Sequence, residues 1–265
     1  MTSLAASDVQ QMVLRTTLSA EVIGRTTREI YARVLEQSTH LDRGNFTRFH
    51  PQDLRRMFDL YDGRFFQGAC RALLGEVPLK FGISKRMTQA AGKTTRREHR
   101  QPFHGLVRRE YEITVSSTLL FQTFCGEERE VAVSGLVCRD RLEALQRVME
   151  HEMVHLLEML LWVDSRCAAA RFQSIAARFF GHTHHTHELI TGRERAWTDF
   201  GIRAGDWVRF RFDGHHYTGR VNRITRRATV LVQDPEGARY SDGNRYSKFY
   251  VPLSMLQRID QPESS

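Results

Sequence analysis

Cysteine and long apolar runs are both scarce in this sequence of 265 residues. The cysteines are far apart and form no CxxC pair; they are Cys70, Cys125, Cys138 and Cys167. This spacing argues against a disulfide framework or a zinc knuckle and favours a reducing compartment, so we expect a cytoplasmic protein. The longest apolar run, residues 156–163, contains Glu158 and is too short to cross a membrane. The N-terminus shows no basic segment followed by an apolar run, so no signal peptide is expected.

Positive charge is in excess. The formal net charge is +8 and the pI about 9.7, and arginine supplies far more of this charge than lysine. Such a balance favours a polyanionic partner, with nucleic acid ahead of a membrane surface. The alternative is a protein that is basic without binding a polyanion. Hydrophobic residues make up 41% of the chain, which is enough for a core in one large domain or two smaller ones.

The motif with the clearest chemistry is His-Glu-x-x-His, formed by His151, Glu152 and His155. Positions four apart on an α-helix share a face, so both imidazoles can reach one metal ion. Zn²⁺ is the usual occupant, with a third protein ligand and a position open to water. Glu152 follows the first ligand, where its carboxylate can take a proton from that water.

The surroundings of this motif predict a buried helix. Residues 142–163 contain no glycine or proline, and their apolar side chains cover most of the helix circumference. A metal ion would satisfy the polar side chains that such a helix buries. The competing interpretation is a pair of hydrogen-bonded core histidines and a surface glutamate. Glu158 lies on the same face as the histidines, where it could orient a ligand imidazole, but we interpret it as an ordinary surface glutamate.

Before this helix the chain mixes helices and strands. Residues 1–50 are polar with helical spacing, which indicates either an accessory helical extension or a flexible leader. A helix is expected from Pro51 to about Gly68. Strands are expected at residues 79–83, 92–96 and 111–116. Residues 93–109 are dense in arginine and histidine and predict a loop or distorted hairpin, either solvated or in contact with phosphate.

A second helix, from about residue 168 to 180, is expected to end at Gly181, a residue suited to a helix C-cap. Four histidines follow within residues 182–187. Such a cluster is either a solvated polar turn or a source of metal ligands. Its place close to the HExxH helix favours a ligand role for one of them.

From residue 200 the sequence takes on the period-two alternation of short strands. Val208 and Phe210 alternate with Arg209 and Arg211, and further strands are expected at 217–224, 228–233 and 248–251. This set predicts a small antiparallel barrel of SH3-like type. Arginine interleaved with aromatic residues suits nucleic-acid contact, and the candidate residues are Arg209, Arg211, Arg220, Arg223, Arg226 and Arg227. A barrel of this kind can instead bind a protein tail or pack on a neighbouring domain.

Four segments occur in a characteristic order: YDGRFFQG at residues 61–68, SKRMTQAAG at 84–92, YEITVS at 111–116 followed by Leu119 and Leu120, and HEMVH at 151–155. Together they resemble the SprT-like (Spartan-type) zinc metalloprotease family over about residues 52–180. The resemblance implies a compact α+β minimal metalloprotease fold with bound zinc. It also implies, as in better-known members, cleavage of proteins bound or crosslinked to DNA. The C-terminal barrel lies outside the resemblance.

The chain departs from the family pattern at the third zinc ligand. The family places it in a His-Gly pair four residues before an aromatic, and counting back from Phe172 that position is Ala168, beside Cys167. Either Cys167 substitutes as a thiolate, or a histidine of residues 182–187 folds back, or zinc is lost. A tight helical hairpin would place the end of the second helix near His151, so we expect His182 first and His187 second, with Cys167 packing.

We therefore predict an α+β protein: a helical extension at residues 1–50, a SprT-like metalloprotease domain at 51–198 and a basic barrel at 199–260. The predicted function is zinc-dependent cleavage of proteins associated with nucleic acid, DNA ahead of RNA. One alternative is a nucleic-acid- or ribosome-associated binding protein whose metal site is structural or vestigial. Another is a module that recognises protein through the barrel.

Overall fold

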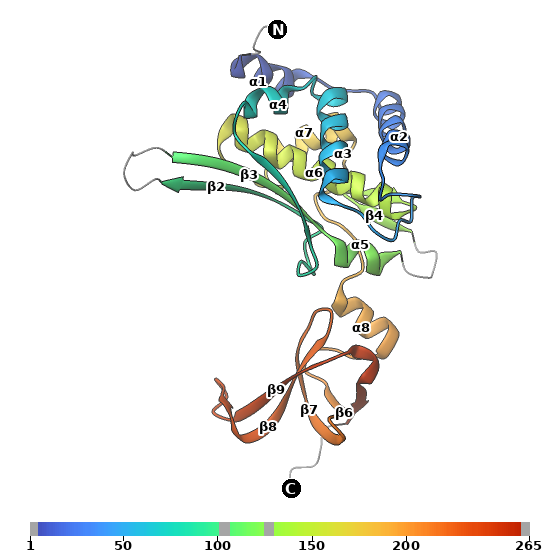
Figure 1. Cartoon of the computed structure of the whole chain (residues 1–265), viewed down its shortest axis with the longest axis vertical. Coiled ribbons are helices and arrows are strands. Elements are labelled where there is room, and N and C mark those ends of the chain that lie inside the picture. The colour runs from blue at the N-terminus through green and yellow to red at the C-terminus, as the bar shows by residue number, and fades with distance from the viewer. Residues whose placement is uncertain (1–4, 101–106, 125–129, 261–265) are drawn as a thin grey trace. The chain divides into compact units, whose positions relative to one another are not determined.

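The computed structural model describes residues 5–100, 107–124 and 130–260. The chain divides into two compact units, Met1–Leu189 and Ile190–Ser265, and each has a hydrophobic core of its own. Helices and strands are mixed along the chain, and an antiparallel sheet forms the C-terminal part, which confirms the predicted α+β class (Figure 1).

The first unit begins with α1 (Ala6–Arg15) and α2 (Ala20–Gln37). Both are amphipathic, and they contribute Val9, Val13, Ile30 and Val34 to the core of this unit. The described part of the N-terminal segment is therefore helical and packed rather than a flexible leader.

Next come α3 (Pro51–Phe65) and the short α4 (Ala69–Leu74). Pro51 is the first helical residue of α3, as expected from its fixed φ angle. The side chain of Asp53 accepts a hydrogen bond from the backbone N–H of His50 (2.8 Å), which completes a capping box at the start of the helix.

Three strands form the sheet of the first unit, in the order β1-β3-β2. They are β1 (Leu79–Ser84), β2 (Gly92–Arg100) and β3 (Val107–Ser116). β1 runs parallel to β3, whereas β2 and β3 form a long antiparallel hairpin (Figure 1). β2 is thus an edge strand of this sheet.

The basic segment 93–109 lies in this hairpin rather than in a loop, although residues 101–106 are outside the described residues. Its arginines contact acidic side chains: Arg97 pairs with Glu112 (2.8 Å) and Arg109 with Glu98 (3.1 Å). These pairs offset much of the positive charge, so the described part of the hairpin is a weaker candidate for phosphate contact than its composition indicated.

The rest of the unit is built around one long helix. α5 (Ser117–Thr123) and the small hairpin of β4 (Val131–Val133) and β5 (Leu136–Cys138) lead into α6 (Arg141–Trp162), which is followed by α7 (Ala170–Phe180). α6 buries apolar residues around most of its circumference, as predicted. Gly181 ends α7 in the left-handed conformation (φ 72°), which confirms it as the C-cap.

The second unit contains α8 (Gly192–Phe200) and a five-stranded antiparallel sheet in the order β10-β6-β7-β8-β9. The strands are β6 (Trp207–Phe212), β7 (His215–Ile224), β8 (Ala228–Arg239), β9 (Arg245–Val251) and β10 (Gln257–Ile259), with a 3₁₀ turn at Leu253–Met255. Alternate residues such as Val208 and Phe210 form its core together with Ala196 of α8. This arrangement agrees with the expected small barrel-like domain.

The structure bears on the membrane-spanning potential of the helices and on the state of the cysteines. Among the described helices, none has both the length and the hydropathy that a membrane span needs. Cys70, Cys138 and Cys167 are free thiols, while Cys125 lies outside the described residues.

Candidate metal centre

The HExxH residues lie in the middle of α6, a helix with well-defined ends. Asp140 caps the N-terminus by accepting from the N–H of Glu143 (2.8 Å), and Trp162 is the last helical residue. His151 and His155 are one turn apart, with ring centroids at 4.9 Å. Both rings also contact Phe172 of α7, which is buried and restricts their orientation.

Cys167 brings a third donor to these histidines. The ligand atoms of His151, His155 and Cys167 all lie within 4.8 Å of one another, and all three residues are half-buried. The chain reaches this position through a sharp reversal after α6, where Val163 adopts φ 70° and ψ −35°. The side chain of Arg96 on β2 donates to the carbonyl oxygen of Val163 (2.8 Å) and holds the reversal against the sheet.

A relay of hydrogen bonds fixes the orientation and the tautomer of His155. The hydroxyl of Ser165 donates to Glu158 Oε2 (2.6 Å), so its oxygen must accept at the contact with His155 Nδ1 (2.7 Å). His155 therefore carries its proton on Nδ1 and leaves the lone pair of Nε2 for a metal ion. Arg171 donates to Glu158 Oε1 (2.6 Å). Glu158 is fully buried, so its interpretation as a surface glutamate is wrong.

Glu152 occupies a buried position between α6 and the start of β2. The hydroxyl of Thr94 donates to its carboxylate oxygen Oε2 (2.7 Å) and also contacts its backbone carbonyl (3.0 Å). Gly92 provides room on the other side, because a Cβ at that position would lie 2.5 Å from Glu152 Oε1. The carboxylate is thus held from β2, by hydrogen bonding to Thr94 and by the close approach of Gly92.

Burial controls protonation at this site. It lowers the pKa of His151 to about 3, with further lowering by nearby histidines, and it lowers the pKa of His155 to about 4. Both imidazoles are therefore neutral near pH 7, the form that binds metals. Burial raises the pKa of Glu152 to about 7, although the hydrogen bonds from Thr94 oppose the rise. A carboxylate with such a pKa is suited to accepting and releasing a proton.

The histidines expected to complete the site have other partners. His182 is buried, and its Nε2 contacts the carboxylate of Glu150 (2.8 Å). His187 Nε2 contacts the carbonyl oxygen of Gln89 (2.9 Å). The end of α7 lies beside α6 near His151, as expected for a tight helical hairpin. However, His182 meets a neighbouring face of the helix, so the geometry favours Cys167 as the third donor.

The donor set fits a zinc ion. Two neutral imidazoles and one thiol are ligands that zinc binds readily, and the half-buried site leaves access for a water molecule and a substrate. The hydrogen bond that fixes His155 through Ser165 is the kind of outer contact that supports metal-bound histidines.

The arginines predicted to contact nucleic acid lie on the second unit and are all exposed. Arg209, Arg211 and Arg220 pair across strands with Thr218, His216 and Trp207, so they share the outer face of the sheet, opposite the core. Arg223 is on β7, and Arg226 and Arg227 lie in the turn between β7 and β8. Lys248 joins the outer face, because it pairs with Leu231, the partner of Arg220.

Several residues of the site could not be found from their own sequence signals. Ser165 and Arg171 are an ordinary turn serine and helix arginine, and Thr94 is one of many strand threonines. Gly92 had a weak signal, since a glycine at the start of a strand often marks a close approach to another element. Cys167 had one signal, its place beside the position of the expected third ligand.

The HExxH helix, the third donor in the following turn and the packed sheet define a domain of the metalloprotease type. The model of the SprT-like family matches residues 54–188, about half of the chain. The chain belongs to the SprT-like family, a family of metalloprotease type. Neither the curated proteins nor the solved structures that were compared contain a match to it. The second unit lies outside the matched residues.

Proposed function

We propose that the protein is a zinc-dependent endopeptidase that acts on proteins associated with nucleic acid. The observation that carries the proposal is the convergence of His151, His155 and Cys167 within 4.8 Å beside the buried Glu152. In this proposal the three converging residues hold the metal, and Glu152 is the general base.

The chemistry follows from the positions of these side chains. A bound zinc ion would acidify a water molecule and polarise the scissile carbonyl group. Glu152 accepts the proton of the attacking water on a carboxylate oxygen and then donates it to the leaving amine. Thr94 holds the carboxylate through its 2.7 Å hydrogen bond, so the base stays directed while it is protonated and deprotonated.

β2 offers a way to hold the substrate. It is an edge strand, and its residues Gly92 and Thr94 contact Glu152. An extended peptide can add to such an edge through main-chain hydrogen bonds, with little dependence on sequence. We propose that the substrate chain pairs with β2, which would align a peptide bond with the catalytic glutamate.

The basic outer face of the second unit supports the nucleic-acid part of the proposal. Arg209, Arg211, Arg220 and Lys248 share that face, with the exposed Tyr250 among them. Arginine beside an exposed aromatic ring suits both phosphate contact and base stacking, and DNA is our first choice of partner. Binding there would raise the local concentration of proteins carried on the nucleic acid.

The catalytic proposal is tested with the purified full chain, by metal analysis and by cleavage of casein with and without single-stranded DNA. Glu152→Gln is expected to keep bound zinc and to lose cleavage, whereas Glu76→Gln, an exposed control, should keep both. Undiminished cleavage by Glu152→Gln would remove the assigned base. Zinc without cleavage by the wild type under any condition would instead favour a binding protein with a structural metal site.

The nucleic-acid proposal is tested by the salt dependence of binding to a single-stranded oligonucleotide. In the triple variant Arg209→Gln, Arg211→Gln, Arg220→Gln, the slope of log K against log[salt] should become less negative. The change should be about 0.7 for each phosphate that the protein no longer neutralises. The control carries the same change at three exposed arginines of the first unit, Arg15, Arg25 and Arg33. Equal reductions in both triple variants would show that net charge acts, rather than the outer face of the sheet.

A further inference from the structure

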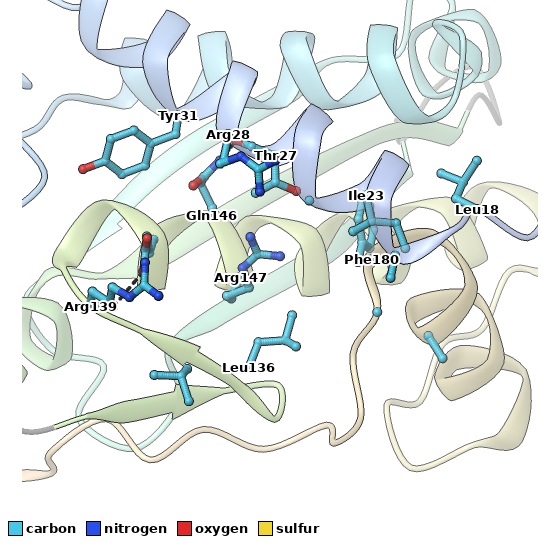
Figure 2. A pocket seen from close by; sticks show the side chains of 16 residues that line it. Leu18, Ile23, Thr27, Arg28, Tyr31, Leu136, Arg139, Gln146, Arg147 and Phe180 are labelled. Carbon is cyan, nitrogen blue, oxygen red and sulfur yellow. Dashed lines mark hydrogen bonds between the residues drawn. The ribbon is translucent and has the colours of Figure 1, made fainter.

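The first unit contains a cavity of about 870 Å³ whose lining does not include the metal-binding group. It is lined by α2, by β5 and the turn after it, by the first half of α6 and by the end of α7 (Figure 2). None of His151, Glu152, His155 or Cys167 lines it. Sites for small molecules in proteins usually have volumes of ~300–1,000 Å³, so this cavity is of suitable size.

Positive charge exceeds negative charge along the walls. Figure 2 shows Arg28 on α2, Arg147 on α6 and Arg139 just before α6, and Glu143 is the acidic residue that lines the cavity. The carboxylate of Glu143 already accepts a hydrogen bond from the backbone N–H of Arg139 (2.7 Å) at the N-terminus of the helix. A ligand would therefore meet three guanidinium groups and one carboxylate that is already engaged.

Arg147 is the most buried of these arginines, with 12% of its side chain exposed. One arm of its guanidinium group donates to Glu150 Oε2 (2.8 Å), and Glu150 is its hydrogen-bond partner among the described residues. A guanidinium group has five N–H donors, so several remain for a ligand. Thr27, also in the wall, has a buried hydroxyl without a hydrogen-bond partner in the described part of the chain.

The remaining lining is largely apolar. Ile23, Leu136 and Phe180 are labelled in Figure 2, and Leu18 and Val137 extend this surface. An apolar wall beside a cluster of arginines is poorly matched to a strongly hydrated polyanion. It matches a molecule with one charged end and an apolar body.

We propose that this cavity binds a small amphiphilic anion, whose acidic group contacts Arg28, Arg139 and Arg147 and whose apolar body packs on Ile23, Leu136 and Phe180. The site depends on α2, which lies outside the residues that match the SprT-like family. The walls from β5, α6 and α7 lie within the matched residues, so only the α2 wall is additional to the matched region. The site does not depend on the proposed peptidase activity.

The first test uses two fluorescent probes with the full chain, the anionic 1-anilinonaphthalene-8-sulfonate and the neutral N-phenyl-1-naphthylamine. We expect the anionic probe to bind about tenfold or more tightly than the neutral one, the difference that a charge-assisted hydrogen bond supplies. Equal affinity for the two probes would overturn the proposed recognition of an anion.

A variant that fills the cavity locates the binding. Gly24 lines the cavity on α2, and a Cβ there would meet the flexible end of Arg28 at 3.3 Å. Gly24→Leu also raises helix propensity, so folding should be preserved. Its matched control is Gly63→Leu on α3, where a Cβ would meet nothing within 4 Å. We expect Gly24→Leu to weaken the anionic probe about tenfold or more and Gly63→Leu to leave it unchanged. Wild-type binding by Gly24→Leu would overturn the site.

The arginines are tested by a double variant, Arg28→Gln with Arg139→Gln, against the control Arg25→Gln with Arg33→Gln on the same helix α2. The test variant should lose about tenfold in affinity for the anionic probe and keep its affinity for the neutral one. The control should match the wild type for both probes. Equal losses in the two variants would mean that general charge, and not the cavity, attracts the probe.

Discussion

Replacing His182 and replacing Cys167 by alanine should have opposite effects on fold stability and on zinc binding. His182 contacts the buried Glu150, whereas Cys167 lies with His151 and His155. His182→Ala should therefore destabilise the fold and keep zinc. Cys167→Ala should keep the fold of the metal-free protein and lose zinc.

The size of the first effect follows from the contacts of Glu150. This carboxylate is fully buried and accepts from Tyr61 (2.7 Å), Arg147 (2.8 Å) and His182 (2.8 Å). Loss of one charge-assisted hydrogen bond costs ~2 kcal/mol, and the space left by the ring adds ~1 kcal/mol. The total of about 3 kcal/mol stays at the low end of the cost of orphaning a buried charge, because two donors remain.

For Cys167→Ala, the affinity for zinc should fall by more than the ~10–100-fold typical of changes in outer contacts, because a direct donor is removed. The free energy of unfolding of the metal-free chain should fall by ~1 kcal/mol or less, since the side chain is small and only half-buried where it packs against the core.

Both variants are measured by thermal unfolding in the presence of a chelator and by competition of a zinc-binding dye. In a domain of this size, 3 kcal/mol corresponds to a fall in Tm of roughly 6–12 °C for His182→Ala. The chelator removes the stabilisation that bound metal would add. The reasoning is refuted if His182→Ala loses zinc at an unchanged Tm, or if Cys167→Ala binds zinc as tightly as the wild type.

Three further predictions concern the surroundings of the site. Gly92→Ala should reduce casein cleavage by about tenfold or more without loss of zinc. The added Cβ would lie only 2.5 Å from Glu152 Oε1 and would displace the catalytic carboxylate. Activity equal to that of the wild type would contradict this close approach. Ser165→Ala should weaken zinc binding by ~10–100-fold, and unaltered affinity would show that the relay to His155 has no role. Because this change also removes a donor to the buried Glu158, it should lower the free energy of unfolding in chelator by ~2 kcal/mol. Tyr61→Phe should lower the free energy of unfolding by ~1.5–3 kcal/mol through the loss of its bond to Glu150, measured by urea titration with zinc content as the control.

The elements of the fold were largely predictable because their signals are local. Pro51 and Gly181 lie at the ends of helices, as their backbone preferences require. The helix expected over residues 142–163 spans Arg141–Trp162 in the structure, since no glycine or proline interrupts its apolar pattern. The alternating residues from 208 onward form the strands of the second unit for the same kind of reason.

The donors around the HExxH motif were less predictable because they depend on tertiary contacts. Cys167 reaches His155 through a valine in a left-handed conformation, and no sequence pattern predicts that reversal. Glutamate is usually a surface residue, yet Glu158 is buried because Ser165 and Arg171 supply its hydrogen bonds. The sequence could place the end of α7 near α6 but could not say which face of α6 His182 would meet.

The reversal at Val163 has a consequence for how a metal would bind. A β-branched residue at φ 70° opposes its own backbone preference by ~1–3 kcal/mol, and the 2.8 Å bond from Arg96 helps to offset that cost. The cost of this backbone conformation is part of the folding free energy, and the turn it forms holds the thiol of Cys167 beside the two imidazoles. A change at Arg96, which supplies no donor atom, would thus be felt as weaker metal retention.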